Sequence, residues 1–147
     1  MDDLIIRTAN EDDVKAIAEL ERNCFSAPWS EHSFNEEITG NKLAIYAVAE
    51  TGGKIIGYAG IWVISGEGHV TNIAVHPDFR RKGIAGDLIT TLIEMSRMFG
   101  ACEYTLEVSS SNDDAISLYK SLGFKEYGIR KEYYEDNSDA LIMWKTK

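Results

Sequence analysis

The stretch N-I-A-V-H-P-D-F-R-R-K-G-I-A, residues 72–85, runs from an apolar strand through a turn and a basic loop into the start of a helix. The first backbone N–H groups of a helix have no partners within it and carry partial positive charge. Arg80–Lys82 add positive side chains at the same place, and Gly83 has no Cβ to hold a ligand away from the backbone. The stretch therefore predicts a site for a phosphate-bearing ligand.

The chain around this basic loop is acidic, with a formal net charge of -9 at pH 7. Non-specific binding to nucleic acid needs a basic footprint, so we expect no direct contact with nucleic acid. The negative charge fits a basic partner, such as a cationic peptide or an amine, drawn in by long-range attraction. Many soluble proteins carry such a charge without any partner, and the composition leaves both interpretations open.

The 147 residues predict a single domain, residues 1–147, large enough to bury a core of its own. No apolar run approaches the roughly 20 residues that cross a bilayer, and the N-terminus lacks the pattern of a signal peptide. We therefore expect a cytoplasmic protein that does not enter a membrane. Cys24 and Cys102 are expected to be small buried thiols, and neither they nor the histidines form a ligand pattern, so we expect no metal.

Hydrophobic patterning and turn residues predict the order β-α-α-β-β-β-α-β-α-β-β along the chain. The expected strands cover residues 4–7, 43–49, 55–64, 69–75, 103–108, 124–133 and 140–144. Hairpins pair strands antiparallel, whereas a strand–helix–strand crossover demands a parallel pair. The sequence thus predicts an α/β (mixed α+β) fold, with a mixed, mostly antiparallel sheet of about seven strands covered on both faces by about four helices.

Capping residues and glycines mark the ends of the expected helices. Asn10, Ser30 and Asn112 are placed to cap three of them. The longest helix follows Gly83 and stops at Gly100. Its apolar face is expected to comprise Ile84, Leu88, Leu92, Met95 and Phe99, which recur at helical spacing.

Three blocks of sequence occur in a fixed order around the basic loop. The loop itself reads Arg80-Arg81-Lys82-Gly83-Ile84-Ala85, and Asn72-Ile73-Ala74-Val75-His76-Pro77 precedes it. The third block is Asn112-x-x-Ala115-x-x-Leu118-Tyr119-x-x-x-Gly123-Phe124. Together they resemble the GNAT superfamily of N-acetyltransferases, whose acetyl-CoA signature is R/Q-x-x-G-x-G/A. The resemblance covers the whole chain and implies the GNAT fold.

Further blocks resemble one branch of that superfamily, the bacterial ribosomal-protein-alanine N-acetyltransferases (RimI type). They are Pro28-Trp29-Ser30, Leu106-Glu107-Val108 ahead of Ser111-Asn112, Arg130-x-x-Tyr133-Tyr134 and Asp139-Ala140-x-x-Met143. Ser109 is a departure, because these relatives often carry arginine after Leu-Glu-Val, and it bears on which acceptor is used.

The resemblance implies transfer of an acetyl group from acetyl-CoA to the N-terminal α-amine of a protein, most simply a basic ribosomal protein that begins with alanine. It implies Glu107 as general base and Tyr119 as general acid. It assigns acceptor binding to Trp29, Tyr133 and Tyr134. The residues that it implies for acetyl-CoA are Ile73, Ala74, Val75, Arg80, Arg81, Lys82, Gly83, Ile84, Ala85, Gly86 and Asn112.

The residues alone leave other interpretations open. Glu107 alternates with apolar residues as on any half-exposed strand, and Tyr119 shares a helix face with Ile116 and Leu122. Within the fold, a lysine or small-amine (polyamine-type) acetyltransferase is an alternative, and so is a non-catalytic module that binds acyl-CoA. A nucleotide-binding module is disfavoured, because the loop matches neither G-x-x-x-x-G-K-S/T nor G-x-G-x-x-G. We expect a monomer or a weak dimer.

Overall fold

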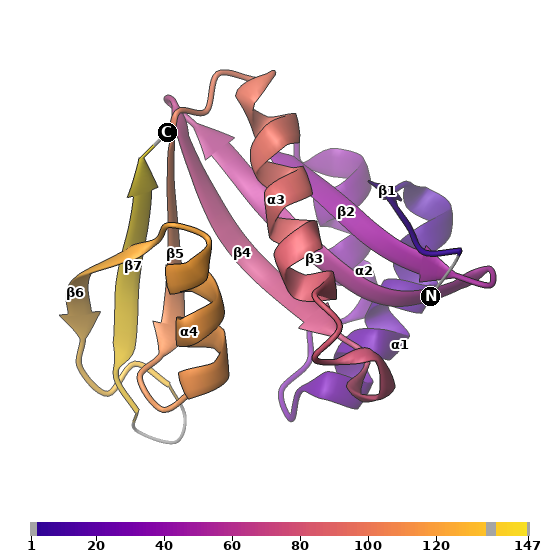
Figure 1. The fold of residues 1–147 in the computed structure, drawn as a ribbon. Helices are drawn as coiled ribbons and strands as arrows, with labels where there is room; N and C mark the ends of the chain where they lie inside the picture. The colour runs from indigo at the N-terminus through magenta and orange to yellow at the C-terminus, as the bar shows by residue number, and fades with distance from the viewer. Residues whose placement is uncertain (1–2, 135–137, 147) are drawn as a thin grey trace.

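A seven-stranded sheet runs through the molecule in the order β1-β2-β3-β4-β5-β7-β6 (Figure 1). The computed structural model describes residues 3–134 and 138–146. The strands are β1 Ile5–Thr8, β2 Ala44–Thr51, β3 Lys54–Ile64, β4 Glu67–Val75, β5 Glu103–Ser109, β6 Lys125–Arg130 and β7 Ala140–Thr146. The helices are α1 Val14–Cys24, α2 Glu31–Asn35, α3 Ile84–Arg97 and α4 Asp113–Ser121.

The order of elements and the mixed, mostly antiparallel sheet confirm the predicted fold class. Among the strands that the structure describes, β4 and β5 form the one parallel pair, and α3 is the crossover helix between them. The strand predicted over residues 124–133 is shorter, since β6 ends at Arg130. No helix within the described ranges is long and apolar enough to cross a membrane.

The helices cover the two faces of the sheet separately. Figure 1 shows α3 and α4 in front of the sheet and α1 and α2 behind it. Leu88, Ile89 and Leu92 of α3 are fully buried against one face, and Ile17 of α1 packs with Phe34 and other aromatic residues against the opposite face. The sheet is therefore sandwiched between two apolar clusters, in agreement with the prediction that helices cover both of its faces.

One prediction about the crossover helix is wrong. Phe99 was expected on its apolar face, but α3 ends at Arg97 and Phe99 is 69% exposed. Gly100, with φ 93°, turns the chain away only after a final irregular turn. Phe99 therefore lies beyond the reach of the helical periodicity from which it was predicted.

The sheet splits open in its middle. β4 and β5 pair only through residues 67–69 and 103–105, and Figure 1 shows the two strands diverging toward their C-terminal ends. A register shift between β3 and β4, where Gly60 pairs with Asn72 and Ile61 with Val70, lies just past the last paired residues. Bulges of this kind bend a strand and increase its twist. The edge of β4 that faces β5 is thus left without a strand partner beyond His69 in the part of the chain described.

The predicted caps define where the helices that flank this opening begin. The Asn112 side chain accepts a hydrogen bond from the Ala115 N–H at 3.2 Å, and the Ser30 hydroxyl accepts one from the Ser33 N–H at 3.1 Å. Gly83 precedes α3 in the left-handed conformation, with φ 79°. Because α3 follows β4 and α4 follows β5, each of the two helices begins after one of the strands that separate.

Candidate functional site

A cleft of about 660 Å³ lies where β4 and β5 have separated. The end of β4, the basic loop, the first turn of α3 and the inner face of α4 line it. The residues predicted for one ligand that the structure brings together here are Ile73, Ala74, Val75, Arg80, Arg81, Gly83, Ile84, Ala85, Gly86 and Asn112. Tyr119, predicted for chemistry, borders the same cleft.

The basic loop leaves the backbone at the start of α3 uncovered. Arg81 and Gly83 both have left-handed φ angles, 62° and 79°. No heavy atom lies within 4 Å of the position that a Cβ on Gly83 would take. The N-terminus of α3 is therefore open, and its unpaired N–H groups can approach an anion closely.

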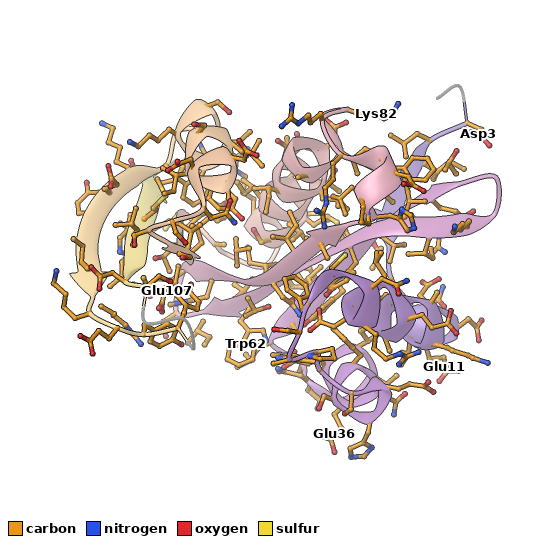
Figure 2. All side chains as sticks on the ribbon, turned by 90° about the horizontal axis from the view of Figure 1, so that it is seen from below. Asp3, Glu11, Glu36, Trp62, Lys82 and Glu107 are labelled. Carbon is orange, nitrogen blue, oxygen red and sulfur yellow. The ribbon has the colours of Figure 1, made fainter. Side chains whose placement is uncertain are left out.

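The three basic side chains of the loop lie differently. Arg80 turns back toward the sheet and donates from Nε to the carbonyl oxygen of Val75 at 3.0 Å. Arg81 borders the cleft. Lys82 is exposed and does not border it, and Figure 2 shows it at the margin of the molecule.

Tyr119 combines an apolar anchor with a polar end at the cleft. The residue is 7% exposed, and its ring packs edge-on against Phe124 with ring centroids 6.0 Å apart. Burial, with a smaller contribution from Tyr134, raises the pKa of Tyr119 to about 12. The phenol therefore keeps its proton at neutral pH and is available as a donor.

Glu107 does not border this cleft. Its neighbours Leu106 and Val108 are buried in the cluster beneath α3 and α4, so alternation along β5 turns Glu107 to the other face of the sheet. Figure 2 shows it on the side that carries α1 and α2. Its half-exposed carboxylate lies 3.6 Å from the guanidinium of Arg130 on β6.

Tyr134 links the surroundings of Glu107 and Tyr119 electrostatically. Burial raises the pKa of Tyr134, and the Glu107 carboxylate and Tyr133 raise it further. Tyr134 in turn contributes to the raised pKa of Tyr119. The two residues predicted for acid–base chemistry lie on opposite faces of the sheet, and both interact electrostatically with Tyr134.

The residues predicted for acceptor binding form two separate groups. Tyr133 and Tyr134 pack edge-on at 5.1 Å between ring centroids, with the Arg130 guanidinium 5.5 Å from the centre of the Tyr133 ring. Trp29 lies in the α1–α2 segment and packs against Phe34 at 5.5 Å. The structure records no ring contact between Trp29 and the two tyrosines among the residues described.

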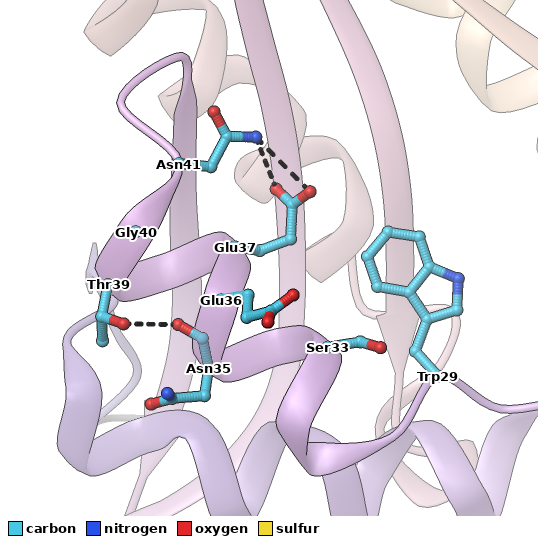
Figure 3. Close-up of a pocket in the computed structure, with 8 residues that line it drawn as sticks. All are labelled: Trp29, Ser33, Asn35, Glu36, Glu37, Thr39, Gly40 and Asn41. Carbon is cyan, nitrogen blue, oxygen red and sulfur yellow. Dashed lines mark hydrogen bonds between the residues drawn. The ribbon is translucent and has the colours of Figure 1, made fainter.

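Trp29 borders a second, acidic pocket (Figure 3). A π-helical turn, Glu36–Gly40, follows α2 directly and supplies half of the residues that line it. Glu37 accepts hydrogen bonds there from Asn41 Nδ2 at 3.3 Å and from Trp62 Nε1 at 2.9 Å. The carboxylates beside Trp29 give this side of the molecule a local negative charge.

Sequence reasoning missed the contribution of α1 to the cleft. Cys24 borders it, with Sγ 3.7 Å from the Val75 carbonyl oxygen and 3.7 Å from an Arg80 nitrogen. It is partly exposed, and Cys102 is exposed, so the prediction that both are buried thiols is wrong. No local signal marks Cys24, because its partners lie 51 and 56 positions along the chain.

Other residues that line the cleft were also missed, namely Phe25, Phe79, Asp114, Ala115 and Leu118. Ala115 and Leu118 stand in the third sequence block, where helical spacing from Asn112 and Tyr119 was the available signal. Within residues 3–134 and 138–146, no group of three or more His, Cys, Asp or Glu side chains is arranged to hold a metal ion.

Comparisons with known proteins agree along nearly the whole chain. A family model described as the acetyltransferase (GNAT) family matches residues 14–124. A Bacillus subtilis (strain 168) protein provisionally named a ribosomal protein bS18-alanine N-acetyltransferase is 39% identical over 142 residues, covering 96% of this chain and 94% of that protein. The ribosomal protein bS18-alanine N-acetyltransferase of Escherichia coli is 36% identical over 134 residues, covering 89% of each. A crystal structure of the Escherichia coli enzyme matches with a TM-score of 0.89 at 34% identity, covering 97% of this chain and 93% of that one.

Proposed function

Because this chain belongs to the acetyltransferase (GNAT) family, we propose that it moves the acetyl group of acetyl-CoA to the N-terminal α-amine of a protein. We propose the alanine N-terminus of ribosomal protein bS18 as the acceptor. The observation that carries this proposal is the identity of 36% and 39% to relatives named for that reaction, across nearly the full length of each. The opened sheet, with its cleft at the start of α3, supports it.

The residues around the cleft fit an anionic, elongated ligand such as acetyl-CoA. The open N-terminus of α3 supplies backbone donors for phosphate, and Arg81 supplies charge beside it. The free edge of β4, including Ile73 and Val75, can pair with an amide-bearing chain as if with another strand. When bound, acetyl-CoA supplies the acetyl thioester.

We assign proton transfer to two residues. Glu107 takes a proton from the acceptor amine, directly or through water, and Tyr119 gives its phenolic proton to the departing sulfur. An α-amine with a pKa near 8 is already partly neutral at pH 7, so a modest base is enough. Trp29, Tyr133 and Tyr134 form opposite walls for the acceptor, on the side of the sheet from which Glu107 is reached.

The partner and its setting follow from the same proposal. The proposed acceptor is a basic ribosomal protein, which the net charge of -9 attracts. The reaction belongs in the cytoplasm, where ribosomes are assembled, and needs no direct contact with nucleic acid. We propose that residues 1–147 act as one domain, as a monomer or a weak dimer.

Thiol release from acetyl-CoA with three kinds of acceptor tests the proposed function. The panel comprises a basic peptide that begins with alanine, the same peptide N-terminally blocked but with a free lysine, and spermidine. Turnover confined to the free alanine peptide is the expected result. Turnover confined to lysine or spermidine would replace it with a side-chain or polyamine acetyltransferase, and saturable acetyl-CoA binding with no turnover would favour a non-catalytic module.

A further inference from the structure

A buried carboxylate that the proposed reaction does not use lies in the last turns of α1. Glu21 is 4% exposed. Its Oε1 accepts a hydrogen bond from the Tyr58 hydroxyl on β3, and its Oε2 accepts one from the backbone N–H of Trp29 at 2.9 Å. One side chain thus ties together α1, the centre of the sheet and the α1–α2 segment.

Glu21 has no cation to offset its burial. Among the residues that the structure describes, no Lys, Arg or His forms an ion pair with it. Burial, with the bond to Glu21, raises the pKa of Tyr58 above its ordinary value. The Tyr58 hydroxyl therefore keeps its proton and donates a hydrogen bond to Glu21. A buried carboxylate held only by two neutral donors is a costly way to stabilise a fold. This cost indicates that the two hydrogen bonds serve to fix the positions of the groups that donate them.

Asp13 at the other end of α1 shows what a structural carboxylate in this protein looks like. It is also buried, at 6% exposure, but Arg7 binds it through two nitrogens, each at 2.8 Å. It closes the capping box with Asn10, and it is not among the described residues that line the cleft or the acidic pocket. Asp13 and Glu21 are therefore a matched pair of buried carboxylates, one directly before α1 and one within it.

The position that Glu21 fixes is that of Trp29. Trp29 lies in the short segment between α1 and α2, and its ring packs on Phe34, which packs on Tyr46 and Tyr58. Figure 3 shows the Trp29 side chain standing at the edge of the acidic pocket. The hydrogen bond that the Trp29 backbone N–H donates to Glu21 holds this edge of the pocket from the buried side of the segment.

We propose that Glu21 is a positioning residue for acceptor binding, which fixes the Trp29 backbone and with it one wall of the acceptor groove. The inference rests on the proposed function, because it requires Trp29 to border that groove. Glu21 touches neither substrate and takes no part in proton transfer.

Glu21→Met tests this proposal with little change in size. The methionine side chain has no oxygen to accept a hydrogen bond, so both the Trp29 N–H and the Tyr58 hydroxyl lose their acceptor. With the alanine peptide varied at saturating acetyl-CoA, KM for the peptide is expected to rise about tenfold, as a lost bond of about 1.4 kcal/mol would produce. The turnover rate at saturation and KM for acetyl-CoA are expected to stay within about twofold.

KM for acetyl-CoA is an internal control, because the end of α1 also borders the cleft. Cys24 lies three positions after Glu21 and contacts Val75 and Arg80. A general displacement of α1 would raise both KM values. Asp13→Asn is the matched variant, expected to lower the melting temperature while leaving KM for the peptide unchanged.

Equal KM values for the peptide in wild type and Glu21→Met would overturn the proposal, and so would a parallel rise in both KM values. Should Glu21→Met fail to fold, Glu21→Asp keeps both oxygens but withdraws them by one methylene, and the same selective rise is expected. Hydrogen exchange at the Trp29 amide gives a readout that needs no acceptor, and it is expected to quicken at least tenfold in either variant. If wild type acetylates no peptide, the proposed function fails, while unchanged amide exchange would show that the Glu21 inference fails separately.

Discussion

The proposed role of Glu107 depends both on its place on β5 and on its carboxylate. It is half-exposed, faces away from the buried cluster and lies at the opening of the sheet. Glu107→Gln is expected to lower kcat/KM for the alanine peptide about 100- to 1,000-fold, because the amide cannot accept the proton of the amine. Thiol release measured at pH 7 checks this.

Glu103 provides the control for Glu107, since it lies four positions earlier on the same face of β5 and is also exposed. Glu103→Gln is expected to leave kcat/KM within about twofold. Equal activity of both variants and wild type would remove Glu107 from the mechanism. Its place on the strand would then be explained by the alternation of a half-exposed strand alone.

Tyr119 carries its proposed role in the hydroxyl and its structural role in the ring. Tyr119→Phe is expected to lower kcat at least tenfold while keeping the packing on Phe124. Since the pKa of Tyr119 is raised to about 12, its acid form persists as pH rises through 10. The alkaline loss of kcat assigned to this group is therefore expected near pH 12 and not near the ordinary tyrosine value, as a pH–rate profile would show.

Tyr104→Phe is the control for Tyr119→Phe, because it removes a tyrosine hydroxyl that has no proposed role in the reaction. Tyr104 is fully buried and its hydroxyl donates to the Ala101 carbonyl oxygen at 3.2 Å. Removing it is expected to cost about 1 kcal/mol of stability without lowering kcat. A kcat that falls equally in both variants would point to stability and not to proton donation.

At the scale of the element, the start of α3 depends on a glycine in a conformation that other residues resist. Gly83→Ala is expected to destabilise the protein by about 1 kcal/mol because of the positive φ. It is also expected to raise KM for acetyl-CoA several-fold, because any relief of that strain moves the N–H groups that face the cleft. Thermal unfolding and a titration of acetyl-CoA measure the two effects.

Gly100→Ala is matched to it in every respect except place. Gly100 has φ 93°, and neither glycine has a heavy atom within 4 Å of where a Cβ would stand. The two variants are expected to lose similar stability, while only Gly83→Ala weakens acetyl-CoA binding. Equal KM values in the two variants would mean that the α3 N-terminus does not hold the ligand.

The elements that could be predicted are those whose signals are local. Caps such as Asn112 and the hairpin pairing of consecutive strands depend on neighbours within a few positions, and the structure confirms them. The prediction for Phe99 is wrong because the helix ends at Arg97, before this residue. Cys24 and Glu21 were missed because their hydrogen-bond partners lie outside α1, and no pattern along α1 indicates these contacts.

At the scale of the molecule, the residues near the basic loop could be assigned to one site because a single crossover brings them together. The groove for the acceptor is different, since its proposed walls come from the α1–α2 segment and from the chain after β6. Local spacing does not relate two such segments. The sequence pattern therefore indicated the ligand cleft directly, whereas Trp29, Tyr133 and Tyr134 were reached only through the family resemblance.

The charge of the whole molecule leads to a prediction about the acceptor. The net charge is -9, and Glu36 and Glu37 add local negative charge beside Trp29. At saturating acetyl-CoA, raising the salt concentration from about 0.05 M to about 0.5 M is expected to lower kcat/KM for a basic alanine peptide roughly tenfold.

The comparison is a peptide with the same alanine N-terminus and glutamine at each basic position, for which little salt dependence is expected. Both peptides offer the same α-amine, so the difference between their slopes measures attraction alone. Equal slopes would mean that the acidic surface plays no part in choosing the acceptor, and that selection lies wholly at the first residue, within the walls that Trp29 and the two tyrosines are proposed to form.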